Sequence, residues 1–213
     1  MTALHKLLQE RFGADKVQEF TAGDQTFPLL LINLKAEKEV TLIMTNGLSD
    51  YQMPVPKKYE GHEFNELYFC LPSYWNLEDP TDINANWVFT WIDKMANFVV
   101  TNKTWFGTGH TIPNGKELLP LSERMKQNHF LLSYPIFLSN ELDAMQLNEK
   151  TIHFLAIIPI FQDEMEFKEA KGTFKIIEEF INAGISEKLD DFRESTLKSK
   201  WNLLRKIPKF RKK

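Results

Sequence analysis

Val40–Trp75, VTLIMTNGLSDYQMPVPKKYEGHEFNELYFCLPSYW, is the stretch of sequence that decides the fold. Val40–Thr45 is apolar and β-branched and runs into Asn46-Gly47, a pair that tolerates the positive φ of tight turns, so it predicts a buried strand that ends there. A second apolar run, Phe64–Leu71, stops at Pro72, which has no N–H to donate to a sheet ladder. The segment between the two runs is too long for a two-residue hairpin. The stretch therefore predicts a strand, a long loop and a second strand.

The chain before this stretch predicts one helix and two strands. Within Thr2–Phe12, leucines at positions i, i+3 and i+4 indicate a short helix, and Gly13 can end it. Val17–Phe20 and Phe27–Leu34 have the composition of strands and are separated by turn-forming residues. Each of these links is too short for a crossover helix, so we expect an antiparallel meander.

A tryptophan-rich helix is predicted after a polar loop at residues 76–85. Asn84 or Asn86 is placed to cap this helix, which runs to about Thr101. Large apolar side chains recur along it at helical spacing. They are Trp87, Trp91, Met95 and Phe98. We expect this stripe to pack in the core rather than to bind a ligand, because aromatic stripes at helical spacing are typical of buried helix faces.

Two further strands and two further helices are predicted in the second half of the chain. Phe130–Tyr134 is the first strand; the second, Thr151–Phe161, is nearly continuous in apolar residues, so we expect it to be central and covered on both faces. The first helix begins near Asp163, and Gly172 leaves open a kink or a new helix start. Its expected apolar face is Phe167, Ala170, Phe174, Ile177 and Ile181. The last helix begins near Ser186, with Leu189, Phe192 and Leu197 as its apolar positions.

The organisation that follows is a single α+β domain over residues 1–197, with a mostly antiparallel mixed sheet and helices packed on one side of it. Hydrophobic residues make up 43% of the chain and aromatic residues 13%, enough for a packed interior. No repeat or linker divides the sequence. Residues 198–213 form a separate basic tail.

The charge distribution is uneven along the chain. Residues 198–213 hold eight of the 26 basic residues and no acid, which leaves residues 1–197 with 18 basic against 29 acidic side chains, a formal charge of −11. Such an acidic body repels nucleic acid and favours basic protein partners. The tail, which mixes aromatic and aliphatic residues with its charges, favours weak binding to polyanions such as a membrane surface or nucleic acid, or else serves as a solubilising end.

The sequence contains few features that indicate a cellular location. Cys70 is the single cysteine and lies in an apolar strand, where a buried inert thiol is expected rather than a nucleophile. We expect no signal peptide, because the first residues, Met-Thr-Ala-Leu-His, contain no basic region that leads into an apolar stretch. We expect no membrane span, because no apolar run approaches the roughly 18 residues that a span needs. The expected location is cytoplasmic.

Catalytic interpretations of the sequence are weak. Gly47–Tyr51 approaches a nucleophile elbow around Ser49, but that motif needs a glycine where Tyr51 stands and a helix that Pro54 prevents. Ser49 and Asp50 are instead expected to hydrogen-bond their own loop backbone. The two glycines of Gly107–Gly109 lack the other residues of a phosphate-binding loop. We expect no catalytic residues.

Metal and cofactor sites are not expected either. The five histidines are scattered, with no spacing that places two ligands on one helix face. His62 with Glu63 and Glu66 is the loosest candidate, and a solvated loop explains it better. The acidic residues near Asp163 fit a helix N-terminus, although Glu164 merits separate attention.

The motifs TNGLSDYQMPVP and NELYFCLPSYW resemble the suppressor of fused family, as do Leu131–Phe137 and the later segment FLAIIPIFQDEMEFKEAKG. The similarity extends over about Phe20–Arg193, and Glu164 matches a glutamate of the family pattern. The resemblance implies protein binding without catalysis: bacterial members resemble immunity proteins, which neutralise a toxin, and the animal founder is a protein-binding regulator.

The function expected from this resemblance is that of an immunity protein that occludes a basic toxin surface with an acidic, aromatic-edged face. The alternatives are an adaptor that binds a peptide segment of its partner, or association with membranes or nucleic acid through the tail. The candidate partner-binding residues fit the family pattern or carry large side chains in loops. They are Asp50, Met53, Pro54, Tyr74, Trp75, Trp105 and Glu164. For Trp75 and Trp105, burial in the core is the competing expectation.

Overall fold

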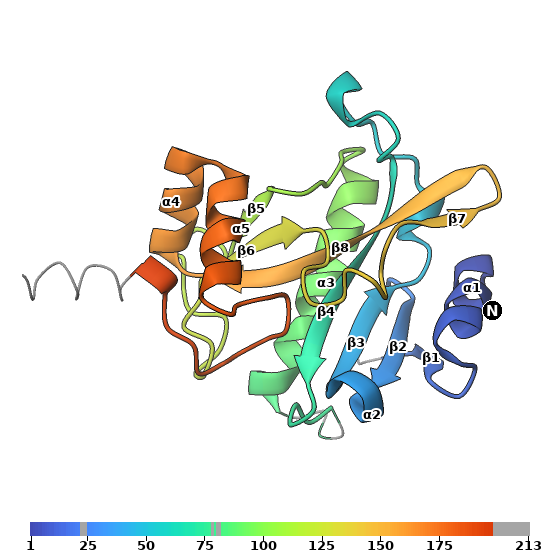
Figure 1. The fold of residues 1–213 in the computed structure, drawn as a ribbon, viewed down its shortest axis with the longest axis horizontal. Coiled ribbons are helices and arrows are strands. Elements are labelled where there is room, and N and C mark those ends of the chain that lie inside the picture. The colour runs from blue at the N-terminus through green and yellow to red at the C-terminus, as the bar shows by residue number, and fades with distance from the viewer. Residues whose placement is uncertain (22–24, 78, 80–81, 198–213) are drawn as a thin grey trace, which may run out of the picture.

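A computed structural model describes residues 1–21, 25–77, 79 and 82–197 (Figure 1). The predicted basic tail at residues 198–213 lies outside these described residues. The first helix, α1 (Ala3–Phe12), is confirmed, and the Thr2 hydroxyl caps it by accepting a hydrogen bond from the backbone N–H of His5 at 3.1 Å.

One mixed sheet forms the centre of the described structure. Its order is β1-β2-β3-β4-β8-β6-β5, with β7 paired to β8 beside β6. The strands are β1 (Val17–Phe20), β2 (Leu29–Leu34), β3 (Val40–Thr45), β4 (Phe64–Pro72), β5 (Thr111–Pro113), β6 (His129–Ser133), β7 (Met145–Leu147) and β8 (Lys150–Ile160). Among the pairings of these eight strands within the described residues, β4–β8 alone is parallel. The prediction of a mostly antiparallel mixed sheet is confirmed.

The opening meander and the central strand are both as predicted. β1 to β4 pair in chain order, with Ile43 of β3 opposite Phe69 of β4. The long β3–β4 link contains two short 3₁₀ turns, η1 (Leu48–Asp50) and η2 (Lys57–Tyr59). β8 lies between β4 and β6, and its last seven residues are all buried. Its apolar run therefore reflects cover on both faces.

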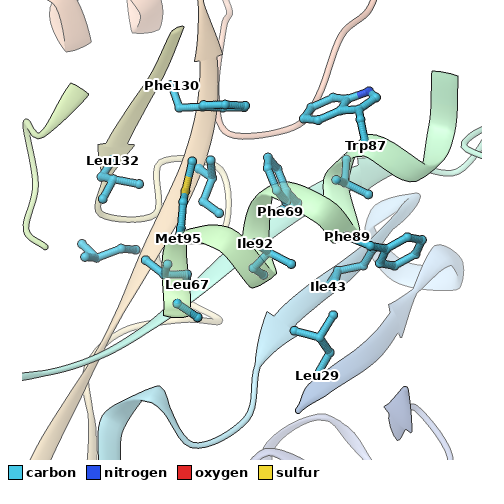
Figure 2. Close-up of a cluster of buried hydrophobic side chains, with 14 of the residues drawn as sticks. Leu29, Ile43, Leu67, Phe69, Trp87, Phe89, Ile92, Met95, Phe130 and Leu132 are labelled. Carbon is cyan, nitrogen blue, oxygen red and sulfur yellow. The ribbon is translucent and has the colours of Figure 1, made fainter. Parts of the chain in front are cut away.

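Helices cover both faces of the sheet, so the prediction of helices on one side is wrong. Side chains of adjacent residues in a strand point to opposite faces. Leu67 and Phe69 of β4 accordingly pack in one core with α3 (Ile83–Thr101), while Tyr68 and Cys70 pack in a second core with α1 and α5 (Thr173–Asn182). Figure 2 shows the α3 side, where Ile92 and Met95 lie over the strand residues.

The α3 helix begins at Ile83, before both of its predicted caps. Asp82 caps it, and its carboxylate accepts a hydrogen bond from the N–H of Asn84 at 2.9 Å, so the predicted Asn84 and Asn86 caps are wrong. The stripe is largely correct at Trp87 and Met95, which are buried. Phe98 is 51% exposed because Val99, one position on, faces the sheet instead.

The predicted helix after β8 is two helices, as the Gly172 alternative allowed. α4 (Gln162–Lys171) ends at Gly172, whose φ of 91° favours glycine, and α5 begins immediately afterwards. The break sets α5 in a different rotation from α4. Ile176 and Phe180 therefore face the sheet, whereas Phe174 and Ile181 of the predicted buried stripe are 92% and 57% exposed.

The helix predicted from Ser186 is wrong. Residues 184–195 run irregularly along the end of β4, where Leu189 N–H donates to the carbonyl of Cys70 at 2.8 Å. The buried Glu187 side chain fixes this path, because its carboxylate accepts hydrogen bonds from the N–H groups of Phe137 at 2.8 Å and Leu138 at 2.9 Å. Leu189 is buried and Phe192 is 79% exposed, so they do not share a helix face.

Candidate functional site

The loop after β3 is held by one carboxylate, that of Glu66 on β4. This side chain is fully buried and accepts hydrogen bonds from the backbone N–H groups of Gly47 at 3.1 Å, Leu48 at 3.2 Å and Ser49 at 3.0 Å. The hydroxyls of Thr45 and Ser49 donate to it as well. Burial raises the pKa of Glu66 to about 7, and these hydrogen bonds oppose the rise. Glu66 therefore fixes the loop from inside the protein. It does not lie in a solvated loop with His62 and Glu63, as the sequence suggested.

Ser49 and Asp50 do not bond their own loop as expected. The Ser49 hydroxyl is buried and donates to Glu66 Oε1 at 2.6 Å, which leaves it turned into the protein. A 3₁₀ turn, and not an α-helix, contains it, so the geometry of a nucleophile elbow does not form. The exposed carboxylate of Asp50 pairs with Lys150 Nζ at 3.3 Å.

The buried side chain of Met53 holds the next part of the loop from inside the protein. Its side chain is 1% exposed, and its sulfur accepts from the backbone N–H of Phe106 at 3.5 Å and the side-chain amide of Asn65 at 3.6 Å. Pro54, its neighbour, is exposed. The loop between β3 and β4 is thus joined to the segment after α3, which carries Trp105.

Six half-buried ring side chains surround this junction, and we call them the aromatic surface. They are Tyr59, His62, Trp105, His110, Tyr134 and His153. Trp105 lies between Tyr59 and His110, with ring centroids 4.9 Å and 4.3 Å away. His62 forms a second group, with its ring centroid 5.9 Å from that of Tyr134 and 4.3 Å from that of His153. Its backbone N–H donates to the carbonyl of Tyr59 at 3.0 Å, which joins the two groups.

Hydrogen bonds fix the orientation of the histidine end of the aromatic surface. The Tyr134 hydroxyl lies 2.8 Å from Nδ1 of His62, and Nε2 of His153 lies 3.0 Å from the carbonyl of Gly61. Burial lowers the pKa of both His110 and His153. The two imidazoles of His110 and His153 therefore favour the neutral form.

Gly107 explains the glycine motif beside Trp105. A Cβ at this position would lie 2.7 Å from Cζ3 of the Trp105 indole, closer than carbon atoms approach without displacement. The glycine thus lets the indole fold over its own chain. Gly107 is thus a steric requirement of the aromatic surface, and Gly109, with a φ of 88°, is required where the chain approaches Thr173.

Tyr74 and Trp75 lie apart from the aromatic surface, past the end of β4. Tyr74 is 57% exposed and its hydroxyl donates to Asp191 at 2.8 Å. It stands at a cavity of about 320 Å³ that Leu189, Phe192 and residues near them also line. Trp75 is buried, with its indole N–H donating to the carbonyl of Ala85 at 3.2 Å, so it belongs to the core.

Glu164 is a clamp inside the protein. Its carboxylate is fully buried and pairs with the Arg193 guanidinium, with Oε1 2.8 Å from Nη1 and Oε2 2.9 Å from Nη2. It also accepts from the N–H groups of Phe161 at 3.0 Å and Thr196 at 3.1 Å. Glu164 therefore ties the start of α4 to the last described residues, out of reach of a partner.

The predicted set thus separates by location. Asp50, Met53, Pro54 and Trp105 belong to the loop junction, Tyr74 lies at the cavity, and Trp75 and Glu164 are buried. Sequence reasoning missed most of the aromatic surface, because its members come from four separate segments. They are Tyr59, His62, His110, Tyr134 and His153. Their shared signal is a ring side chain at a loop or strand end, which many buried residues share.

The described residues contain neither a metal-binding cluster nor a membrane-spanning helix. Within them, no group of three or more His, Cys, Asp or Glu side chains is arranged to hold a metal ion. The same part of the chain has no helix that combines the length and the apolar character needed to cross a bilayer.

Comparisons with known proteins agree on one family. The family model described as Suppressor of fused protein (SUFU) matches residues 23–194, more than half of the chain. A search of curated protein sequences gives no match. Among solved structures, the chain is similar to a SUFU homolog from Neisseria gonorrhoeae FA 1090, with 21% identity, a TM-score of 0.58 and coverage of 91% of this chain and 94% of that one.

Two further structures share the fold. The Sufu–Fu complex structure gives 13% identity and a TM-score of 0.65, covering 97% of this chain and 95% of that one. Drosophila Suppressor of Fused gives 16% identity and a TM-score of 0.60, and the match covers 86% of this chain but only 46% of that one. At these identities the structural likeness establishes the fold alone.

Proposed function

This chain belongs to the suppressor of fused family, and from that membership we propose that it acts by binding another protein, without catalysing a reaction, through the aromatic surface. One relative was solved as the Sufu–Fu complex. The observation that carries the proposal is the cluster of half-exposed rings around Trp105, next to a loop that Glu66 holds in place.

Two physical properties make this surface suited to binding. Tyrosine and tryptophan supply large contact areas with few rotatable bonds, and they are enriched among the residues that dominate interface energies. The loop beside them is held by buried contacts of Glu66 and Met53, so little conformational freedom is lost on docking. Asp50 and Pro54 are exposed on the same loop and are proposed as the rim of the site.

The finer proposal is an immunity protein that works in the cytoplasm and neutralises a toxin by covering its surface. The net charge of −11 over residues 1–197 favours it, because an acidic body attracts a basic partner. We propose residues 1–197 as the binding unit. An adaptor that binds a peptide of its partner is the second candidate, which the aromatic surface also accommodates.

A pull-down from native host lysate tests the general proposal. The baits are the full chain, a truncation that ends at Thr196, a Tyr59→Ala/Trp105→Ala double variant, and a Leu119→Ala control in which an exposed apolar residue elsewhere is removed. We expect one stoichiometric partner, identified by mass spectrometry, with the full chain, the truncation and the control. The double variant should lose it while keeping its circular dichroism spectrum.

The outcome also separates the alternatives. Retention by the double variant would place the interface elsewhere and contradict the aromatic surface. Binding confined to the full chain and removed by salt would assign function to residues 198–213. For the immunity form, the recovered partner should arrest growth when expressed alone and not when this chain is co-expressed; a partner whose isolated peptide binds equally well indicates an adaptor.

A further inference from the structure

The rings around Trp105 continue past the aromatic surface to the end of α3. The ring centroid of His110 lies 4.3 Å from that of Trp105 and 6.2 Å from that of Phe106. Phe106 in turn stacks on Phe98, with a centroid distance of 6.1 Å. Phe106 is buried, but Phe98 is 51% exposed. The partly exposed rings of this set are Tyr59, Trp105, His110 and Phe98, and we call them the Trp105 group.

Lysine side chains border the Trp105 group. The exposed Lys58 holds its Nζ 4.7 Å from the ring centroid of Tyr59, over the face of the ring. Burial lowers the pKa of His110, and the positive charges of Lys168 and Lys58 lower it further, so both cations lie near this imidazole. Rings and cations are thus combined at one site.

Of the two lysines, Lys58 is the one whose charge is available. Lys168 pairs with the carboxylate of Glu169 at 2.8 Å. Lys58 forms no ion pair with any of the residues that the structure describes. A ligand that reaches Tyr59 therefore meets an uncompensated positive charge.

The charge beside the Trp105 group is opposite to that of the acidic body. Residues 1–197 carry a formal charge of −11. The second group of rings, around His62, has a carboxylate beside it: burial lowers the pKa of His153, whereas the carbonyl of Gly61 and the charge of Glu63 raise it. The cation over Tyr59 is therefore a local feature of one part of the aromatic surface and does not follow from the overall composition.

We propose that the Trp105 group binds an acidic segment of the protein partner. In this segment an apolar or aromatic side chain packs on the Trp105 indole, and a neighbouring aspartate or glutamate pairs with Lys58. The assignment rests on the proposed function, because it specifies which kind of segment the aromatic surface contacts.

Desolvation of Lys58 is the physical reason. A partner that packs on Tyr59 also covers the ammonium group above this ring, and a buried charge without a counter-ion costs free energy. A carboxylate of the partner offsets that cost, whereas a lysine or arginine at the same place adds repulsion between like charges. An acidic segment is therefore favoured over a neutral or basic one at this position.

An acidic segment is compatible with a partner that is basic overall. The acidic body steers the approach of a basic protein from a distance, whereas Lys58 acts on the group that contacts it. Single-stranded nucleic acid also stacks on aromatic rings beside cations. The charge of −11 over residues 1–197 repels such a polyanion along its whole length, and a protein segment with few carboxylates avoids most of that repulsion.

Selection of random peptides displayed on phage, with the full chain as bait, tests the chemistry of the segment. Counter-selection on Tyr59→Ala/Trp105→Ala removes peptides that do not depend on the rings. We expect the remaining peptides to contain aspartate or glutamate next to an aromatic or aliphatic residue. With Lys58→Glu as bait, lysine or arginine should replace the acidic residue.

Fluorescence anisotropy with a labelled synthetic copy of the most enriched peptide measures the contribution of Lys58. We expect Lys58→Glu to raise the dissociation constant by about tenfold or more, and Lys58→Met, which keeps the stem without the charge, by about threefold. A peptide whose acidic residue is changed to lysine should recover binding to Lys58→Glu. Lys6→Glu reverses an exposed lysine on α1, which packs on the other face of the sheet, and should leave the dissociation constant unchanged.

The outcomes distinguish the acidic segment from the proposed function. Ring-dependent peptides without acidic residues, or an acidic peptide that binds Lys58→Glu as tightly as the parent, would overturn the acidic segment and leave the aromatic surface as a binding site. A thymidine oligonucleotide that binds through Trp105 more tightly than the peptide would assign the site to nucleic acid instead. If no peptide depends on the rings, both the acidic segment and the proposed binding surface are overturned.

Discussion

Glu66 and Glu164 are both fully buried carboxylates that hold a segment of irregular chain, yet the protein satisfies them in opposite ways. Glu66 receives neutral donors, three backbone N–H groups and two hydroxyls, and has a raised pKa. Glu164 receives the Arg193 guanidinium together with backbone N–H groups.

The difference matches what each clamp joins. Glu66 holds residues 47–49, immediately after its neighbouring strand, so the chain itself supplies the donors. Glu164 holds residues about 30 positions later, where a long guanidinium side chain can span from the last described segment to α4. A buried charge needs either several neutral donors or one opposite charge, and local chain geometry decides which is at hand.

The largest effect on the unfolding free energy is expected at the buried ion pair of Glu164 and Arg193. Arg193→Ala leaves the Glu164 carboxylate buried without its cation, and removal of one partner of a buried pair costs about 3–5 kcal/mol of unfolding free energy. Urea denaturation at pH 7 measures this. The double variant Arg193→Ala/Glu164→Gln should regain part of the loss, and a loss below about 1 kcal/mol in the single variant would contradict the clamp.

Glu66, which is held by neutral donors, should make the unfolding free energy depend on pH. Because the folded pKa of Glu66 is about 7, above its ordinary value of 4.5, the folded state binds more protons than the unfolded state between these values. The contribution of Glu66 to the unfolding free energy therefore falls as pH rises from about 4.5 to about 7, by about 3 kcal/mol. Urea denaturation at pH 5 and pH 8 should show this slope.

Glu66→Gln provides the control, since the amide does not titrate. The variant should remove that part of the pH dependence while the remaining slope, from other groups, persists. Equal slopes in parent and variant would show that Glu66 stays ionised and that the two clamps differ less than proposed here.

A smaller effect on the unfolding free energy is expected at Gly107, beside Trp105 of the aromatic surface. Gly107→Ala places a methyl group against the Trp105 indole, and overpacking of this kind costs about 1–3 kcal/mol. The indole is half-buried and can shift outward, so we expect the lower end of that range together with a red-shifted tryptophan emission. An unchanged emission in Gly107→Ala would contradict the tight packing.

The smallest effect is expected at the exposed pair of Asp50 and Lys150. Both groups are solvated, so Asp50→Asn should change the unfolding free energy by less than about 0.5 kcal/mol. Chemical denaturation at low and moderate salt checks this. A larger loss would mean that Asp50, like the buried carboxylates, helps to hold the loop.

Several elements follow from the sequence because their cause is local. The strand at Val40–Thr45, the long loop and the strand that ends at Pro72 were predictable from β-branched runs and turn residues. The family resemblance was also correct, since ordered motifs along the chain carry it. The break at Gly172 was visible as an alternative, because glycine weakens a helix wherever it stands.

The failures share a different cause. The α5 stripe was predicted by continuing the phase of α4, and the break changed the rotation, so Phe174 became exposed. The segment after Ser186 has helical periodicity, but its backbone hydrogen-bonds to Cys70 of β4 instead. In both cases another feature outweighed the periodicity of the stretch: the break at Gly172 in the first, and tertiary contacts in the second.

The sequence by itself determined six of the eight strands in the described residues, the uneven distribution of charge along the chain, and membership of the suppressor of fused family. It missed the two three-residue strands β5 and β7, which are too short to carry a pattern of their own. Tertiary structure alone decided which carboxylates are buried, where the Glu164–Arg193 pair forms, and that rings from four segments gather in two groups, one around Trp105 and one around His62. These depend on distances between residues far apart in sequence, which are fixed only when the sheet brings β4 and β8 together and its two faces are covered.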